Sequence, residues 1–365
     1  MKKHLISINP SLLTWAREEA GYSATEVALQ TDTPLEEYLS FESTGEGVPR
    51  TTLEKIATIL KRQTAVFFLP NTPPKAKHPK DYRNIKARTN KLHPDTLFAI
   101  RQANSFQESA LDLEPSDSWS EGRLFLDAIK LKEKSEQIRL LRQKLGISSI
   151  DQTHFSNTNT AFREWRKAIE EKLGILVFQF SFPTEDAQGF CLAESLPMVI
   201  IVNGNYAPAN RIFTLFHEIA HLLQTQSGLC GWESEDNHDE FICNDFAGYF
   251  LLPIVSECSD LFELQRRSTR AKVSREVYLR RLESEKLISK SIFFEWLAEI
   301  RKEGLQKQKI KSDKPVIVLP EVKSRSIRGD RYYNSVLDSL RTDRISFPQA
   351  SRLLDVRMGR LEHEI

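Results

Sequence analysis

The sequence has few of the features that mark secreted or membrane proteins. No apolar run approaches the roughly eighteen residues that a membrane-spanning helix needs. Lys2 and Lys3 precede only a short apolar stretch, which ends at Asn9-Pro10, so no signal peptide is predicted. The chain has only 4 cysteines, and they show neither a C-x-x-C spacing nor the density of a disulfide scaffold. These absences predict a cytoplasmic protein with no membrane partner.

The chain also lacks an overall charge of one sign. Its 51 Lys and Arg residues balance 50 Asp and Glu residues, for a formal net charge of +1. The bases are clustered, however: residues 75–91 hold seven against Asp81, and residues 266–281 hold seven against Glu276. Each cluster is either solvated surface or a nucleic-acid contact. In the second cluster the candidate DNA contacts are Arg266, Arg267, Arg270, Lys272, Arg275, Arg280 and Arg281.

One short motif carries most of the chemical information. His217-Glu-Ile-Ala-His221 spells H-E-x-x-H within a stretch, Pro208 to about Gln224, whose apolar residues recur at helical spacing. The i, i+4 spacing puts both imidazoles on one helical face, where they can bind one ion, and Glu218 can take a proton from a metal-bound water. Burying two imidazoles and a carboxylate costs free energy unless each has a partner, and one metal ion can offset this cost for all three.

A catalytic zinc needs a third protein ligand nearby. Glu240 begins a helix-like run that ends at Pro253, and Asn244 shares its face. We therefore predict Glu240 as the third ligand and Asn244 as a hydrogen-bond partner of a ligand histidine. His238, in the loop expected before this helix, is the alternative ligand. The acidic competitors are Glu233, Glu235, Asp236 and Asp239.

Two further roles stay open within this region. The first is the electrophilic group that a hydrolase needs for the developing oxyanion. The second is the role of Cys243, which lies one turn from Glu240. Cys243 is either a packed core thiol or a metal or redox group. The candidates for the oxyanion are Tyr206, Arg211, His238 and Tyr249.

These residues resemble a known family. The chain is similar to the ImmA/IrrE family of bacterial and phage metallopeptidases in three places. These are the block Arg211-Ile-Phe-Thr-Leu-Phe-His-Glu-Ile-Ala-His-Leu-Leu, then Glu240-x-x-Cys243-Asn244-x-x-Ala247, and then Leu251-Leu-Pro253. The resemblance implies a zinc ion held by His217, His221 and Glu240, with Glu218 as general base. Characterised proteases of this family cut a repressor-type transcription regulator. The resemblance thus also implies a protein substrate, a helix-turn-helix repressor encoded nearby.

The N-terminal region has a different composition. Residues 1–72 are predicted to form a bundle of short helices, similar to the helix-turn-helix domain of phage-repressor-like regulators. The candidate capping boxes are Ser23-x-x-Glu26, Thr33-x-x-Glu36 and Thr51-x-x-Glu54. Residues 1–70 carry seven bases against nine acids, the wrong sign for phosphate contact, so docking of a protein is an alternative to DNA binding. The expected core is Leu12, Leu13, Ala16, Val27, Ala28, Leu35, Leu39, Leu53, Ile56, Ala57 and Leu60.

The remaining patterns predict an α+β, mostly helical protein. Residues 174–180, 189–193 and 198–202 predict three strands of a small sheet, whose edge can align an extended peptide by strand addition. Helices are expected in the central and C-terminal regions. The predicted organisation is a helix-turn-helix-like domain 1–72, a basic linker 73–94, a zincin-like domain with helical flanks 95–302, a linker 303–320 and a small C-terminal helical segment 321–365.

Two functions fit these patterns. The first is a zinc-dependent endopeptidase, with one zinc ion per chain, that regulates transcription by cleaving a partner repressor. The second is a non-proteolytic, DNA-linked transcription regulator in which the zincin domain senses a ligand or holds shape. Glu218 favours the first function, because a structural zinc site needs no general base.

Overall fold

The computed structural model describes residues 4–73, 92–224, 229–230, 238–309 and 318–364. Its contacts divide the chain into two units, and the division falls inside helix α6 (Pro94–Leu113). Of the described residues, those up to Asn104 belong to the first unit and those from Ser105 to the second. The predicted basic linker lies mostly outside the described residues. None of the described helices combines the length and the apolar character needed to cross a bilayer.

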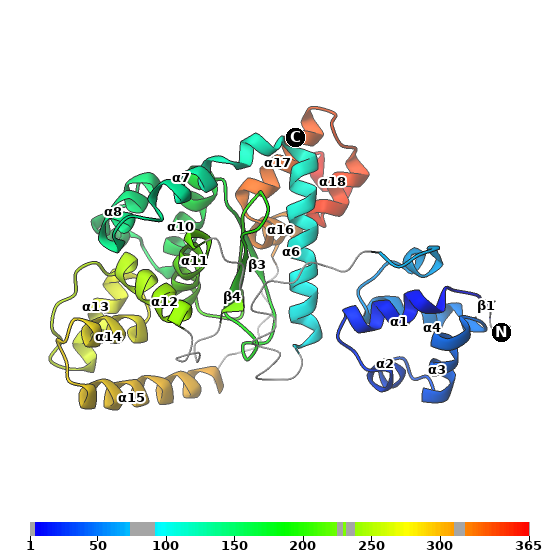
Figure 1. The fold of residues 1–365 in the computed structure, drawn as a ribbon, viewed down its shortest axis with the longest axis horizontal. Helices are drawn as coiled ribbons and strands as arrows, with labels where there is room; N and C mark the ends of the chain where they lie inside the picture. Colours follow the sequence, from blue (N-terminus) through cyan, green and yellow to red (C-terminus); the bar gives the residue numbers. More distant parts are fainter. Residues whose placement is uncertain (1–3, 74–91, 225–228, 231–237, 310–317, 365) are drawn as a thin grey trace. The chain divides into compact units, whose positions relative to one another are not determined.

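The first unit is a bundle of short helices (Figure 1). Asn9 caps the first helix, and Ser23 forms the predicted capping box with Glu26 at the second. Two-residue strands β1 (Leu5–Ile6) and β2 (Val48–Pro49) pair antiparallel. The helices are α1 (Pro10–Glu19), α2 (Ala24–Gln30), α3 (Leu35–Thr44) and α4 (Arg50–Ile59), followed by the 3₁₀ helix η1 (Thr64–Phe68).

The core of this unit differs from the predicted one along α3. Tyr38 and Phe41 are buried, whereas Leu35 and Leu39 are 40% and 46% exposed, so their prediction as core residues is wrong. The two aromatic residues, three positions apart, define the inner face of the helix and leave the leucines on the outer face. Neither Thr33 nor Thr51 caps a helix, because Pro34 and Pro49 occupy the cap positions of α3 and α4. The other predicted core residues are buried: Leu12, Leu13, Ala16, Val27, Ala28, Leu53, Ile56, Ala57 and Leu60.

A four-stranded sheet organises the second unit. Its order is β3 (Leu176–Phe180), β5 (Val199–Asn203), β4 (Gly189–Leu192) and β6 (Leu229–Cys230). The first three coincide with the predicted strands. The prediction missed β6, because two residues are too few to show alternation. β3 and β5 are parallel, and β4 runs antiparallel to β5 and β6.

Helices form the rest of the second unit. The last helix before residue 310 is α15 (Lys290–Lys309), so the predicted linker at residues 303–320 begins as helix. Residues 310–317 lie outside the described part. Before the sheet come η2 (Ser116–Trp119), α7 (Glu121–Ile129), α8 (Lys134–Leu145), α9 (Ser149–His154) and α10 (Thr158–Leu173). The strands are followed by α11 (Pro208–Leu223), α12 (His238–Leu251), α13 (Leu261–Ala271), α14 (Arg275–Ser284), α15 (Lys290–Lys309), α16 (Pro320–Arg328), α17 (Asp330–Arg341), α18 (Phe347–Leu354) and α19 (Met358–Leu361).

Successive residues of β3 contact two different layers of helices. Val177 belongs to the core formed with α10 and α11, in which Trp165 meets Phe216 edge-on with ring centroids 4.9 Å apart. The next residue, Phe178, packs against Tyr332 of α17 at 5.6 Å. Because neighbouring side chains on a strand point to opposite faces, helices cover both faces of the sheet at β3.

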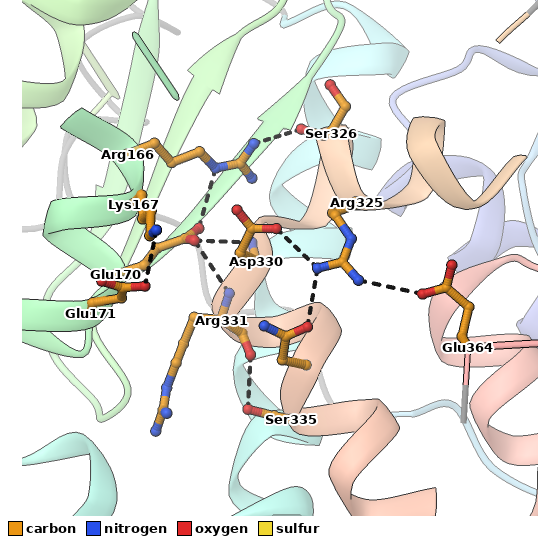
Figure 2. Close-up of polar contacts among 11 residues, drawn as sticks. Arg166, Lys167, Glu170, Glu171, Arg325, Ser326, Asp330, Arg331, Ser335 and Glu364 are labelled. Carbon is orange, nitrogen blue, oxygen red and sulfur yellow. Dashed lines mark hydrogen bonds and ion pairs between the residues drawn. The ribbon is translucent and has the colours of Figure 1, made fainter. Parts of the chain in front are cut away.

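A buried ion pair attaches the C-terminal helices to α10 (Figure 2). Arg166 and Glu170, one turn apart, are 7% and 2% exposed, and their side chains meet at 3.2 Å. Glu170 accepts hydrogen bonds from the backbone N–H groups of Asp330 at 2.9 Å and Arg331 at 3.2 Å, at the start of α17. Arg166 donates to the carbonyl of Ser326 in α16 at 2.6 Å.

The same contacts cover the end strand of the sheet. Arg166 also donates to the Val177 carbonyl of β3, and α16 lies against this strand. Gly329 permits the close approach, because it has φ +80° and a Cβ there would collide with the Glu170 carboxylate. Residues 318–364 therefore pack as part of the second unit rather than as a detached tail.

Glu170→Ala tests this attachment. Burial raises the pKa of Glu170 to about 7, so at pH 8 the carboxylate is ionised, and its removal leaves the Arg166 guanidinium buried without its partner. We expect a loss of about 3–5 kcal/mol of unfolding free energy in urea at pH 8. The control is Glu171→Ala, which removes an exposed pair with Lys167 and should cost less than about 1 kcal/mol. Equal losses in the two variants would contradict the assignment.

Candidate metal centre

α11 brings the two histidines of the motif together inside the protein. Pro208 stands in its first turn, where the missing N–H is no loss, and residues 212–223 are all buried. His217 and His221 lie one turn apart, with ring centroids separated by 4.9 Å and Nε2 atoms by 3.1 Å. The helix ends at Leu223, close to the end expected from the sequence.

Glu240, in the first turn of α12, completes a triangle with these histidines. Its carboxylate oxygens lie 3.3 Å from the Nε2 atoms of His217 and of His221. Within the described ranges, no other group of three His, Cys, Asp or Glu side chains has the spacing of a metal site. His238 is exposed and Asp239 half-buried, and neither belongs to this group. The competitors Glu233, Glu235 and Asp236 lie outside the described residues.

The triangle has the dimensions of a zinc site. Zinc bonds to nitrogen and oxygen are about 2.0–2.2 Å long and tetrahedrally arranged, which places neighbouring ligand atoms about 3.3 Å apart. Here the two Nε2 atoms are 3.1 Å apart, and each lies 3.3 Å from one oxygen of the Glu240 carboxylate, Oε2 for His217 and Oε1 for His221. Two imidazoles and one carboxylate are also a donor set that leaves one tetrahedral position for water. The residues present therefore fit a zinc ion.

The electrostatics of the triangle favour a cation at its centre. All three residues are buried, at most 4% exposed. Burial opposes ionisation of Glu240, but hydrogen bonds from His217 and His221 outweigh it and lower its pKa to about 2. Burial likewise opposes the charged form of His221, but hydrogen bonds with Cys243 and Glu240 raise its pKa to about 11. An ionised carboxylate beside two imidazoles stabilises positive charge at this point.

Glu218 lies where α11 approaches β4. It is 0% exposed, and its charge helps to raise the pKa of His221. A Cβ built on Gly189 of β4 would be 3.3 Å from Glu218 Oε1 and only 2.5 Å from Thr214 Cγ2. Glycine at position 189 thus allows the strand to lie directly against Glu218. The sequence interpretation missed Gly189, whose only signal is a glycine at the start of a strand.

Side chains from three other helices hold the C-terminal end of α12. Arg142 donates to the carbonyl of residue 250 at 3.0 Å, Gln152 to that of residue 251 at 3.1 Å, and Arg281 to that of residue 252 at 3.1 Å. Carbonyl groups at a helix C-terminus lack intrahelical partners, and cations stabilise them. Burial lowers the pKa of Arg142 to about 10. These contacts anchor the helix that presents Glu240.

This position corrects the prediction that Arg281 contacts nucleic acid. Arg281 is only 4% exposed, because its guanidinium is turned inward onto the end of α12. Arg267, Arg275 and Arg280 form ion pairs with carboxylates at 2.6, 2.9 and 2.9 Å. Arg266 and Arg270 are exposed and Lys272 is half-buried. A nucleic-acid role for these remaining bases stays a prediction.

Asn244 and Cys243 lie beside the triangle on α12. The Nδ1 atoms of His217 and His221 are buried and have no hydrogen-bond partner in the described part of the chain, so the predicted bond from Asn244 is not formed. A supporting role for Asn244 stays a prediction. Cys243 is fully buried in the core, and Gln224 Nε2 approaches its sulfur at 3.8 Å.

The structure does not single out an oxyanion helper. The hydroxyl of Tyr206 donates to the Thr184 carbonyl at 2.9 Å. Arg211 donates to Gln179 of β3. Tyr249 is flanked by two cationic side chains, 4.3 and 4.6 Å from its ring centre. Each of these candidates therefore has another partner in the structure.

The comparison with protein families agrees with this geometry. Residues 170–283 match the family model of the IrrE N-terminal-like domain, Peptidase_M78. The matched stretch contains the sheet, α11 and α12, and so includes the whole triangle and Glu218. This part of the chain is therefore similar to a metallopeptidase-type domain. No curated protein and no solved structure matches the chain.

Metal content tests the triangle. The purified chain should hold about one zinc ion, measured by plasma mass spectrometry after dialysis. His221→Ala and Glu240→Ala should each lose most of it, because each removes one of three ligands. His238→Ala is the matched control and should retain the metal. Loss of zinc from His238→Ala with retention in Glu240→Ala would assign the third ligand to His238 instead.

Proposed function

We propose that this protein is a zinc-dependent endopeptidase that regulates transcription by cleaving a partner repressor. The observation that carries the proposal is a buried triangle of zinc-site dimensions, two of whose residues lie on the helix that also bears Glu218. A structural zinc site usually has four protein ligands and needs no general base. The described residues instead supply three ligands and an adjacent buried carboxylate.

The side chains divide the chemistry among them. A zinc ion at this site would supply Lewis acidity and lower the pKa of a bound water toward neutrality. His217, His221 and Glu240 would hold that ion in a fixed position. Glu218 would accept the proton of the attacking water and return it to the leaving amine. The buried setting of α11 would keep bulk water away from this proton transfer.

The sheet favours one edge for an extended peptide. β3 is covered by α10 and α16, and β5 is an internal strand. β4 lies against Glu218 at Gly189 and, within the described residues, pairs with β6 only at Gly189 and Phe190. A peptide aligned along β4 would use main-chain hydrogen bonds and lie next to α11. This asymmetry supports strand addition at the β4 side.

The substrate class rests on similarity. The match of residues 170–283 to the IrrE N-terminal-like domain supports a peptidase. The ImmA/IrrE resemblance supports a repressor-type regulator as the protein that is cut. Cleavage of such a repressor would relieve repression of its target genes.

Co-expression with the regulator encoded beside this protein tests the proposal. The wild-type chain should produce a discrete regulator fragment, detected by immunoblot and located by mass spectrometry. Glu218→Gln keeps the side-chain size and the metal ligands but cannot accept the proton. We expect it to slow fragment formation by at least about 100-fold while retaining zinc.

The control is Glu299→Gln, the same chemical change at an exposed position of α15, which should cleave like the wild type. A fragment that forms equally with Glu218→Gln would show that another protease makes it. An intact regulator, controlled equally by the wild type and Glu218→Gln, would support the alternative, a non-proteolytic regulator whose zincin domain is a sensor or structural module.

A further inference from the structure

The middle of the sequence of the first unit contains no Lys or Arg. From Glu18 to Pro49 the chain has eight Asp and Glu residues and no Lys or Arg. This stretch includes all of α2 and α3. Glu42 is used internally, since it accepts hydrogen bonds from Arg17 at 2.6 Å and Tyr38 at 3.0 Å. Glu36 and Glu37 are exposed in the first turn of α3.

This charge distribution is unsuited to duplex DNA. α2 and α3 are joined by the short connection at residues 31–34, as in modules that place their second helix in the major groove. Such modules depend on Lys and Arg to contact phosphates. Lys55 of α4 reaches this connection, but its ammonium lies 3.4 Å from the Asp32 carboxylate. The exposed carboxylates of α3 would repel a phosphate backbone.

The same helices expose large apolar side chains. Leu29 of α2 is 78% exposed, and Leu35 and Leu39 of α3 are 40% and 46% exposed. Leu35 and Leu39 are one turn apart and therefore share a face. We use the name α2–α3 face for the exposed surface of these two helices, which carries these leucines and, in the first turn of α3, Glu36 and Glu37. Apolar side chains bordered by charged ones are typical of protein interaction surfaces.

We propose that the α2–α3 face docks a basic, amphipathic helix of a protein partner. The leucines of this face would pack against the apolar side of that helix, as anchors do in helix-in-groove recognition. The exposed carboxylates would attract Lys and Arg on its flanks, which raises the association rate and rejects acidic partners. The proposal goes beyond the peptidase function and does not depend on it, because none of these residues belongs to the metal centre.

Binding of designed peptides to the full-length chain tests the proposal. One fluorescent peptide carries a leucine stripe flanked by Lys and Arg, and a second carries Glu at those basic positions. By anisotropy, the basic peptide should bind, and its affinity should fall as salt rises. Leu35→Ser with Leu39→Ser, and separately Glu36→Lys with Glu37→Lys, should each weaken binding at least about tenfold.

Matched variants separate this face from general charge effects. Glu295→Lys with Glu299→Lys makes the same charge change on exposed positions of α15 and should leave the affinity within about twofold. Circular dichroism checks that each variant is folded. Glu36→Gln with Glu37→Gln is a milder variant, which removes the two negative charges from the first turn of α3 without adding positive ones. This milder pair should also weaken binding.

Three outcomes would overturn the proposal. In the first, the acidic peptide or a short DNA duplex binds the wild type better than the basic peptide does. In the second, the α15 variant weakens binding as much as the α3 variants. In the third, the chain forms a dimer that Leu35→Ser with Leu39→Ser abolishes, which would make a second copy of the chain the occupant of this face.

Discussion

Three buried polar side chains from two helices, His217, His221 and Glu240, lie within 3.3 Å of one another. The packing of the second unit has to hold these side chains together. Such groups are costly to bury unless each has a partner, so both helices must be held firmly. α11 is fixed by an apolar surface packed against α10 and the sheet, with Trp165 and Phe216 in contact. α12 is fixed at its other end by Arg142, Gln152 and Arg281. The apolar core and the helix-end contacts thus stabilise a polar centre that would otherwise oppose folding.

The parts of this arrangement that could be predicted are those that depend on local periodicity. The spacing of His217 and His221 and the apolar stripe of α11 share the helical repeat, and Glu240 follows on the next helix. The β-branched run of β5 likewise marks a buried strand. Local periodicity was insufficient on α3, where Leu35 with Leu39 and Tyr38 with Phe41 both fit a helical face. The larger aromatic residues occupy the core, and the sequence pattern alone did not distinguish the two faces.

Contacts between distant residues could not be predicted. Arg281 lies in a basic cluster, and a basic residue in such a cluster is ordinarily at the surface. It is buried because the end of α12, 29 residues away in the chain, presents an unpaired carbonyl. Glu170 likewise resembles a surface residue of an amphipathic helix, yet it caps α17 across 160 residues. Neither partner can be inferred from spacing, since both depend on how the helices pack.

In the proposed function, catalysis and selectivity have different physical sources. A zinc triangle acts on any peptide bond placed beside it, and strand addition along β4 recognises mainly the peptide backbone. Neither gives strong preference for one regulator. A second contact on the same chain, such as the α2–α3 face, would raise the effective concentration of one partner at the metal centre without changing the chemistry there. The absence of bases from residues 18–49 and the exposure of Leu35 and Leu39 then have one common explanation, because selection for protein docking would remove phosphate-binding groups and retain apolar anchors.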